Sequence, residues 1–113
     1  MHELSLCENI LQMIEQQAKD QQFTRVLTVF LEIGQLSGVE PEAISFCFDA
    51  VMAGSVAAHA KLVIVPQAGL AWCAKCYHHF EIQHRYDECP ICGSYEFQIK
   101  KGEHLRISEL EVI

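Results

Sequence analysis

Four cysteines in the second half of the chain form two C-x-x-C turns, separated by twelve residues. A two-residue spacer lets the chain reverse, so that both sulfur atoms of a turn can point at one ion, and this spacing is typical of a tetrahedral zinc site. Two-residue loops are poor frameworks for disulfides, which makes disulfide bonding the weaker interpretation. The sequence therefore predicts a structural Zn²⁺ whose four coordination positions are filled by the thiolates of Cys73, Cys76, Cys89 and Cys92.

Iron is the main alternative metal for these thiolates. The segment from Cys89 to Gly93 resembles a rubredoxin turn, because Gly93 can adopt a positive φ. The first turn has Tyr77 at the matching position, so we expect the two-fold arrangement of rubredoxin to be only half present. Tetrahedral thiolates accept either metal, and a red, redox-active protein would identify iron. Zinc is the favoured prediction.

Three histidines lie close to the cysteines. His78 and His79 follow the first turn, and His84 lies between the two turns. One interpretation is that they are solvated or hydrogen-bonded; the other is that one of them stabilises the thiolates, or exchanges with one as the pH falls. No Ser, Cys or Lys nucleophile can be paired with a base from the sequence, so nothing in it indicates an enzyme.

The amino terminus offers a second set of donor atoms. The α-amine of Met1, the deprotonated amide of His2 and the His2 imidazole can chelate one ion in a nearly planar set, since methionine before a bulky residue is generally retained. Glu3, through its amide or carboxylate, or Glu40 could complete the set. Planar nitrogen donors suit Ni²⁺ or Cu²⁺ better than Zn²⁺. Taken alone, a histidine at position two usually has no such role, so the motif needs support from the rest of the chain.

Composition limits the class of partner. The 113 residues carry a formal net charge of −7, which argues against nucleic acid. We expect no membrane span and no secretory signal, because the apolar runs are short and Met1 is not followed by a basic region and an apolar stretch. Six cysteines without an export signal fit a reducing cytoplasm, where thiolates hold metal.

Hydrophobic periodicity predicts an α+β fold in which two helices pack on a small three-stranded sheet, with an inserted zinc-ribbon-like lobe. We expect a core at residues 1–69 plus 101–113 and a zinc-binding lobe at 70–100. The first helix should bury a stripe of Leu4, Cys7, Leu11, Ile14 and Ala18, with Ile10 beside it, and Cys47 should be buried on the second helix. The expected helices are 3–21 and 41–54; the expected strands are 25–34, 62–65 (closed by Pro66), a hairpin strand at Phe80 and Ile82, and 104–112, with a bulge between Ile107 and Leu110.

Along its whole length the chain resembles the HypA/HybF family, the nickel chaperones of [NiFe]-hydrogenase maturation. The resemblance is carried by the Met1-His2-Glu3 start, segments 31–34 and 46–49, the two C-x-x-C turns and the closing stretch 105–112, which occur in the same order. It implies nickel bound through His2 at the amino terminus and zinc held by the four cysteines. It further implies delivery of nickel to the hydrogenase large subunit together with a HypB-type GTPase.

The resulting prediction is a cytoplasmic nickel metallochaperone, without catalytic activity, that binds Ni(II) through Met1, His2 and Glu3. Two alternatives from other classes stay open. One is a zinc-ribbon adaptor that binds only proteins and has no transferable metal. The other is a rubredoxin-like electron carrier, for which an iron spectrum is the test.

Overall fold

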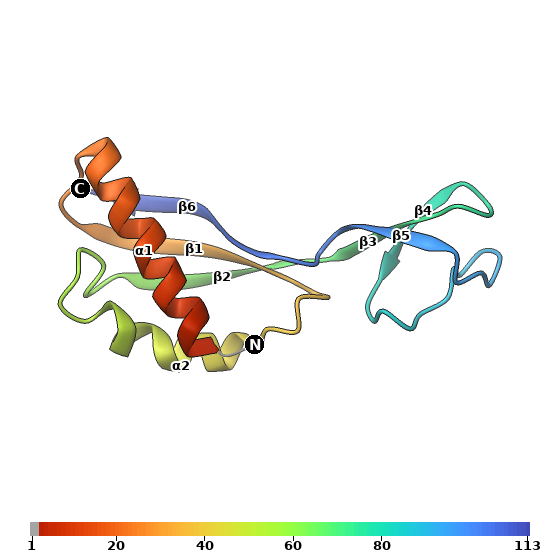
Figure 1. The fold of residues 1–113 in the computed structure, drawn as a ribbon, viewed down its shortest axis with the longest axis horizontal. Helices are drawn as coiled ribbons and strands as arrows, with labels where there is room; N and C mark the ends of the chain where they lie inside the picture. The colour runs from red at the N-terminus through yellow and green to blue at the C-terminus, as the bar shows by residue number, and fades with distance from the viewer. Residues whose placement is uncertain (1–2) are drawn as a thin grey trace.

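Two helices and three strands form the larger lobe of the computed structural model, which describes residues 3–113. Strand β1 (Val26–Gly34) lies in the centre of the sheet, parallel to β2 (Lys61–Gln67) and antiparallel to β6 (Leu105–Val112). Figure 1 shows α1 (Glu3–Gln21) crossing the sheet obliquely and α2 (Pro41–Met52) lying beside β2. The predicted arrangement of two helices on a three-stranded sheet is confirmed.

Alternation along β1 places one row of side chains against both helices. Val29, Leu31 and Ile33 are buried in one cluster with Ile14 of α1 and Phe48 of α2. The predicted bulge in the last strand is also present: the register of β6 against β1 shifts between residues 107 and 109, as it must for the hydrophobic face to be kept.

Two details of the expected elements are wrong. Leu4 is 52% exposed, because the buried stripe of α1 consists of Cys7, Ile10 and Ile14 in its central turns. Strand β2 does not close at Pro66 but continues to Gln67, with Pro66 opposite Ile33. Since β2 is an outer strand, the missing amide of a proline can face away from the ladder.

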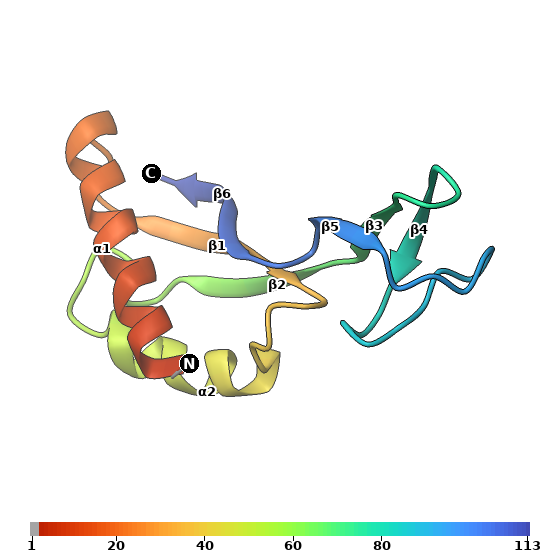
Figure 2. The same cartoon turned by 45° about the vertical axis from the view of Figure 1, so that its right-hand side comes forward.

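The smaller lobe, here called the metal lobe, is a second three-stranded antiparallel sheet in the order β4-β3-β5. Figure 2 shows it at the opposite end of the long axis of the molecule, which measures 52 × 26 × 17 Å. The sequence predicted strand residues at Phe80 and Ile82, and both lie in β4 and are buried. It missed the other two strands of this sheet. The bounds are β3 (Gly69–Cys73), β4 (His78–Ile82) and β5 (Phe97–Lys101).

Three chain segments meet where the lobes join. The amide of Leu36 donates to the carbonyl of Gly102 over 2.7 Å, and the Leu36 side chain is buried in the cluster of the metal lobe rather than that of the larger lobe. A methyl group on Gly34 would overlap the carbonyl of Gly102, so the close approach of these strands requires glycine. Arg85 adds an ion pair with Glu103 and a hydrogen bond to the carbonyl of Leu36. The loop that leaves β1 is thereby attached to the metal lobe.

Within residues 3–113, neither helix combines the length and the apolar character that crossing a membrane requires.

Candidate metal centre

The two cysteine turns have the same backbone shape. In the first, the amide of Tyr77 donates to the carbonyl of Cys73 over 2.9 Å; in the second, the amide of Gly93 donates to the carbonyl of Cys89 over 2.8 Å. Tyr77 has a φ of 59° and Gly93 a φ of 74°. The expectation that the missing glycine would leave the two-fold arrangement half formed is therefore wrong, because Tyr77 adopts the left-handed conformation at a cost of about 1–2 kcal/mol. Turn geometry alone thus does not favour zinc over iron.

The four sulfur atoms gather at one point between the turns. Each contact crosses from one turn to the other: Cys73 Sγ lies 3.6 Å from Cys92 Sγ, and Cys76 Sγ lies 3.6 Å from Cys89 Sγ. All four ligand atoms lie within 4.8 Å of one another. A tetrahedron with metal–sulfur bonds of about 2.3 Å places its sulfurs roughly 3.8 Å apart. The donor set and its spacing therefore fit one tetrahedral thiophilic ion, and the structure brings together all four cysteines that the sequence predicted.

The first cysteine of each turn has a lowered pKa, which favours its thiolate form. A backbone hydrogen bond from the amide of Cys76 lowers the pKa of Cys73 to about 7, against the effect of burial. Burial acts to raise the pKa of Cys89, but backbone hydrogen bonds, chiefly from Cys92, outweigh it and lower that pKa. Both side chains are buried, so these backbone amides supply the stabilisation that water would otherwise give.

The second cysteine of each turn behaves in the opposite way. Desolvation and the neighbouring sulfur atoms raise the pKa of Cys76 to about 12. For Cys92, a backbone hydrogen bond from Ser94 acts to lower the pKa, but burial and the sulfur of Cys73 raise it overall. Four converging thiols thus cannot all ionise without a cation between them, and a bound metal ion would stabilise the fully ionised set.

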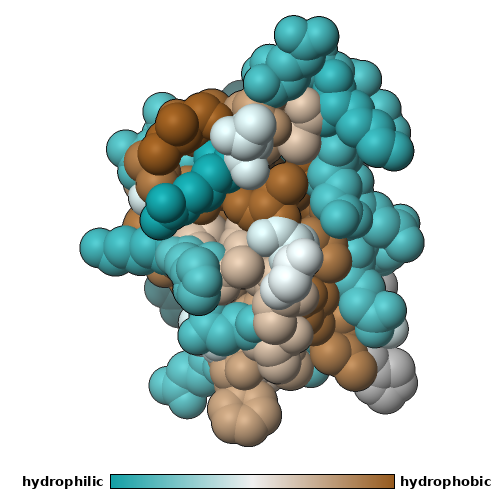
Figure 3. Space-filling model, turned by 90° about the vertical axis from the view of Figure 1, so that its left-hand side faces the viewer, coloured by the Kyte–Doolittle hydropathy of each residue, from teal (hydrophilic) through white to brown (hydrophobic). Residues whose placement is uncertain are grey.

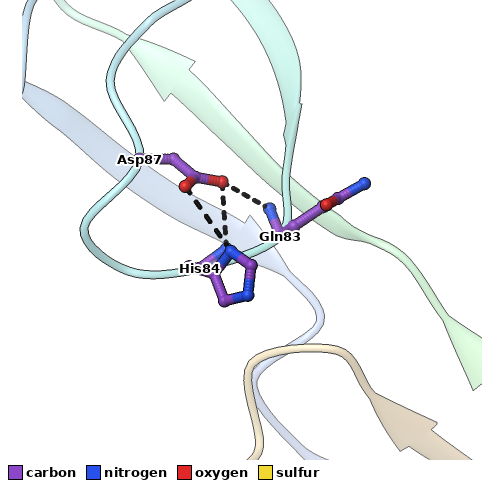
Figure 4. A network of polar contacts seen from close by, with 3 residues as sticks. All are labelled: Gln83, His84 and Asp87. Carbon is purple, nitrogen blue, oxygen red and sulfur yellow. Dashed lines mark hydrogen bonds and ion pairs between the residues drawn. The ribbon is translucent and has the colours of Figure 1, made fainter.

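A capped turn connects β4 to the second cysteine pair (Figure 4). One carboxylate oxygen of Asp87 accepts hydrogen bonds of 3.0 Å from the backbone amides of Gln83 and His84. These bonds, that of His84 first, lower the pKa of Asp87. The imidazole of His84 lies 3.6 Å from the other Asp87 oxygen and stacks on Tyr86 at 4.9 Å between ring centroids. The local sequence thus fixes the approach to Cys89 without using the metal.

Each of the three histidines contacts a group other than a cysteine sulfur. His78 Nδ1 lies 2.7 Å from the carbonyl oxygen of Cys76, and His79 packs on Trp72 with 4.7 Å between ring centroids. His84 pairs with Asp87, as described above. These contacts agree with the interpretation of hydrogen-bonded histidines rather than with a role for one of them beside the thiolates.

Part of the predicted nickel site, Met1 and His2, lies outside the described residues. Glu3 is the first residue of α1 and is partly buried, whereas Glu40, directly before α2, is exposed. Near this end of α1, the Cys7 thiol lies 3.7 Å from the carbonyl oxygen of Ile44 on α2. Cys7 is fully buried, as predicted, and burial with the nearby Cys47 and Glu3 raises its pKa to about 11. Cys7 therefore packs against α2 near the start of α1.

The fold and the centre together define a class: small two-lobed α+β proteins whose second lobe carries a four-cysteine metal site. Residues 1–112 match the family described as "Hydrogenase/urease nickel incorporation, metallochaperone, hypA". This chain belongs to the HypA family, as its sequence resemblance predicted.

Individual relatives agree with this assignment. The chain is 49% identical over 112 residues to hydrogenase maturation factor HypA of Rhodopseudomonas palustris (strain BisA53), and 52% identical to that of Azotobacter chroococcum mcd 1, with 99% of each chain covered in both cases. Among solved structures it is similar to the Ni metallochaperone HypA from Helicobacter pylori, with a TM-score of 0.76 and 28% identity, covering 100% of this chain and 98% of that one.

Proposed function

We propose that this chain is a nickel metallochaperone that binds Ni(II) through His2, with Met1 and Glu3 as further ligands. It helps to insert the ion into the large subunit of a [NiFe]-hydrogenase, in the cytoplasm and together with a HypB-type GTPase. The observation that carries the proposal is the match of the whole chain to a family of nickel-incorporation metallochaperones. The donor-rich Met1-His2-Glu3 start supplies the nickel ligands in this proposal.

The position of Glu3 supports this choice of ligands. Glu3 opens α1, so residues 1 and 2 directly precede a helix amino terminus. Deprotonated backbone amides are anionic ligands, and the positive end of a helix dipole favours negative charge at that place. A chelate at the start of the chain, rather than in a buried cage, would leave coordination positions free for exchange to a partner protein.

Zinc is the metal that we assign to the metal lobe, held by Cys73, Cys76, Cys89 and Cys92. Four thiolates leave no open position for water, so the ion would supply a structural cross-link and no hydrolytic chemistry. Because the two turns are also compatible with iron, the test is elemental analysis of the purified protein with a visible spectrum. One zinc per chain and no colour support the assignment; a red protein with iron would replace it with the electron-carrier function.

Nickel binding can be tested by equilibrium dialysis of zinc-loaded protein. Three forms are compared with the unaltered chain: His2→Gln, a form with one glycine added before Met1, and His59→Gln as a control at an exposed histidine in the 53–59 turn region. We expect His2→Gln and the glycine extension to lose nickel while keeping zinc, and the control to keep both. Equal nickel binding in all forms would move the site to other side chains.

Hydrogenase activation separates chaperone function from metal binding. A strain lacking its own copy of the gene is supplied with each variant, and hydrogenase activity is measured at low and at high nickel. We expect His2→Gln to fail at low nickel and to recover partly at high nickel, because excess ion bypasses delivery. Full activity of His2→Gln at low nickel would favour the adaptor function, in which the chain binds partners but carries no metal.

A further inference from the structure

Strand β6 forms the outer edge of the larger sheet, whose order is β2-β1-β6. A groove of about 450 Å³ lies along this edge, between α1 and β6. Its helix side is lined by Met13, Gln17 and Gln21, and Met13 is 46% exposed. The unpaired backbone of an edge strand is a template for a further strand, and here that template adjoins a partly apolar groove.

The hydrogen bonds at both ends of β6 reveal which backbone groups face the open edge. At one end, the carbonyl of His104 accepts from Gly34; at the other, Ile113 donates to Arg25 and accepts from Thr24. Antiparallel strands alternate between residues that bond one neighbour and residues that bond the other. Counting inward from both ends, and allowing for the bulge, the outward-facing residues are Leu105, Ile107, Leu110 and Val112.

We propose that a second copy of this chain pairs its β6 antiparallel to this edge, in a register that sets Ile107 opposite Leu110 of the other copy. The same register sets Leu105 opposite Val112. Every outward-facing residue then meets an outward-facing residue, so four hydrogen-bonded pairs form about a two-fold axis at the bulge. The result is one continuous six-stranded sheet. This proposal does not depend on nickel binding.

The side chains agree with this register. Leu105, Ile107 and Leu110 pack against the core on the helix-covered face and are only partly buried, so a strand beside them would cover their exposed edges. On the other face, Arg106 pairs with Glu32 of β1 within its own chain and would also meet Glu111 of the second copy, and this contact would occur twice. Opposite charges facing one another across two strands are stabilising.

A shift of one residue in either direction would lose both kinds of match. Outward-facing groups would stand opposite groups that already bond β1, and in one direction Glu109 would face Glu109 of the second copy. A bulge and exposed charges ordinarily protect an edge from pairing, but in the proposed register they are complementary. This self-complementarity is what selects a second copy as the occupant rather than an unrelated strand.

Apolar side chains are also exposed near the end of β6. Val112 is 40% and Ile113 65% exposed, and Figure 3 shows hydrophobic surface in the middle of this end of the molecule with hydrophilic side chains around it. The start of α1 and the metal lobe both lie away from the middle of β6 (Figure 1). The pairing would therefore leave both regions accessible.

Sedimentation equilibrium over a range of protein concentrations tests the pairing, with three charge variants. Glu111→Arg sets like charges opposite one another twice per dimer, and we expect it to weaken self-association about tenfold. Arg106→Glu together with Glu111→Arg restores opposite charges between the copies; because it also removes the ion pair between Arg106 and Glu32, we expect it to recover association in part. Glu109→Arg is the matched control: it makes the same change of charge on the same strand, faces Ser108 of the second copy, and should have little effect.

Amide hydrogen exchange of the unaltered protein gives a readout that requires no variant. Raising the concentration should protect the amides of Leu105, Ile107, Leu110 and Val112, while that of Arg106, which faces β1, should not change. A monomer at all concentrations would overturn the proposal, as would a dimer that Glu111→Arg leaves intact or one whose added protection lies outside β6.

Discussion

The larger lobe and the metal lobe each contain a three-stranded sheet, but different interactions hold the two sheets together. The cluster of the larger lobe includes the fully buried side chains of Ile14, Leu31 and Phe48 and is covered by two helices. That of the metal lobe consists of Leu36, Ala71, Phe80 and Ile82 with two of the cysteines. A cluster of this size does not offset the conformational entropy of some thirty residues at about 1–2 kcal/mol each. We therefore expect the larger lobe to fold by apolar burial and the metal lobe to need a bound ion.

Removing the metal should give the largest effect, because it should unfold one lobe and leave the other folded. With a strong chelator, or in Cys73→Ser, we expect the metal lobe to unfold, because structural zinc sites supply about 10 kcal/mol or more of folding free energy. Hydrogen exchange should show lost protection in β3, β4 and β5 and retained protection in β1. Glu88→Gln, a change of charge beside Cys89, is the control. It should keep the protection of the metal lobe and that of β1. Concerted loss of protection in β1 would show that the lobes fold as one unit.

A cavity in the larger lobe tests whether that lobe depends on apolar burial and not on the ion. Phe48 is 1% exposed within the core cluster, and Phe48→Ala should lower the free energy of unfolding of that lobe by about 3–5 kcal/mol. Denaturant titration followed by the exchange of β1 amides gives the value, and metal content should remain one ion per chain. As a comparison, Phe46→Ala removes a side chain of the same type that is 87% exposed, and it should cost well under 1 kcal/mol.

The two lobes also differ in how far the sequence predicted them. Periodicity sufficed for α1, β1, α2 and β6 because each buries one face, and the C-x-x-C spacing sufficed to predict that the four cysteines gather at one point. The strands β3 and β5 were missed because each has only 5 residues, too few for a clear hydrophobic pattern. The matching shape of the two turns was missed because Tyr77 adopts a conformation that glycine normally supplies. The junction through Leu36 and Arg85 depends on contacts between distant segments, for which the sequence carries no local signal.

Leu36 is the side chain that crosses the division between the lobes. It belongs to the loop after β1 but is buried, with 8% exposed, in the cluster of the metal lobe. We expect Leu36→Ala to lower the stability of the zinc-loaded metal lobe by about 2 kcal/mol, near the low end for leucine because the site lies at the edge of its cluster. Exchange of the β4 amides measures it. Arg85→Gln, which removes only a half-exposed ion pair and a hydrogen bond, should cost about 1 kcal/mol or less. A larger effect of Arg85→Gln would mean that the junction is mainly polar.

The last predicted effect is an alkaline one, and it distinguishes the two kinds of cysteine. Burial raises the pKa of Cys7 to about 11, whereas an unfolded thiol titrates near pH 8.5–9. A pKa raised on folding means that the contribution to stability is fully present below pH 9 and is lost as the pH rises from about 9 to about 11. Unfolding titrations across that window should show this decline in the unaltered protein and a shallower one in Cys7→Ala, with Cys47→Ala as the control. The metal-lobe cysteines, ionised in the zinc-bound form, should add no decline there. An equal slope in Cys7→Ala would show that folding does not raise the pKa of Cys7.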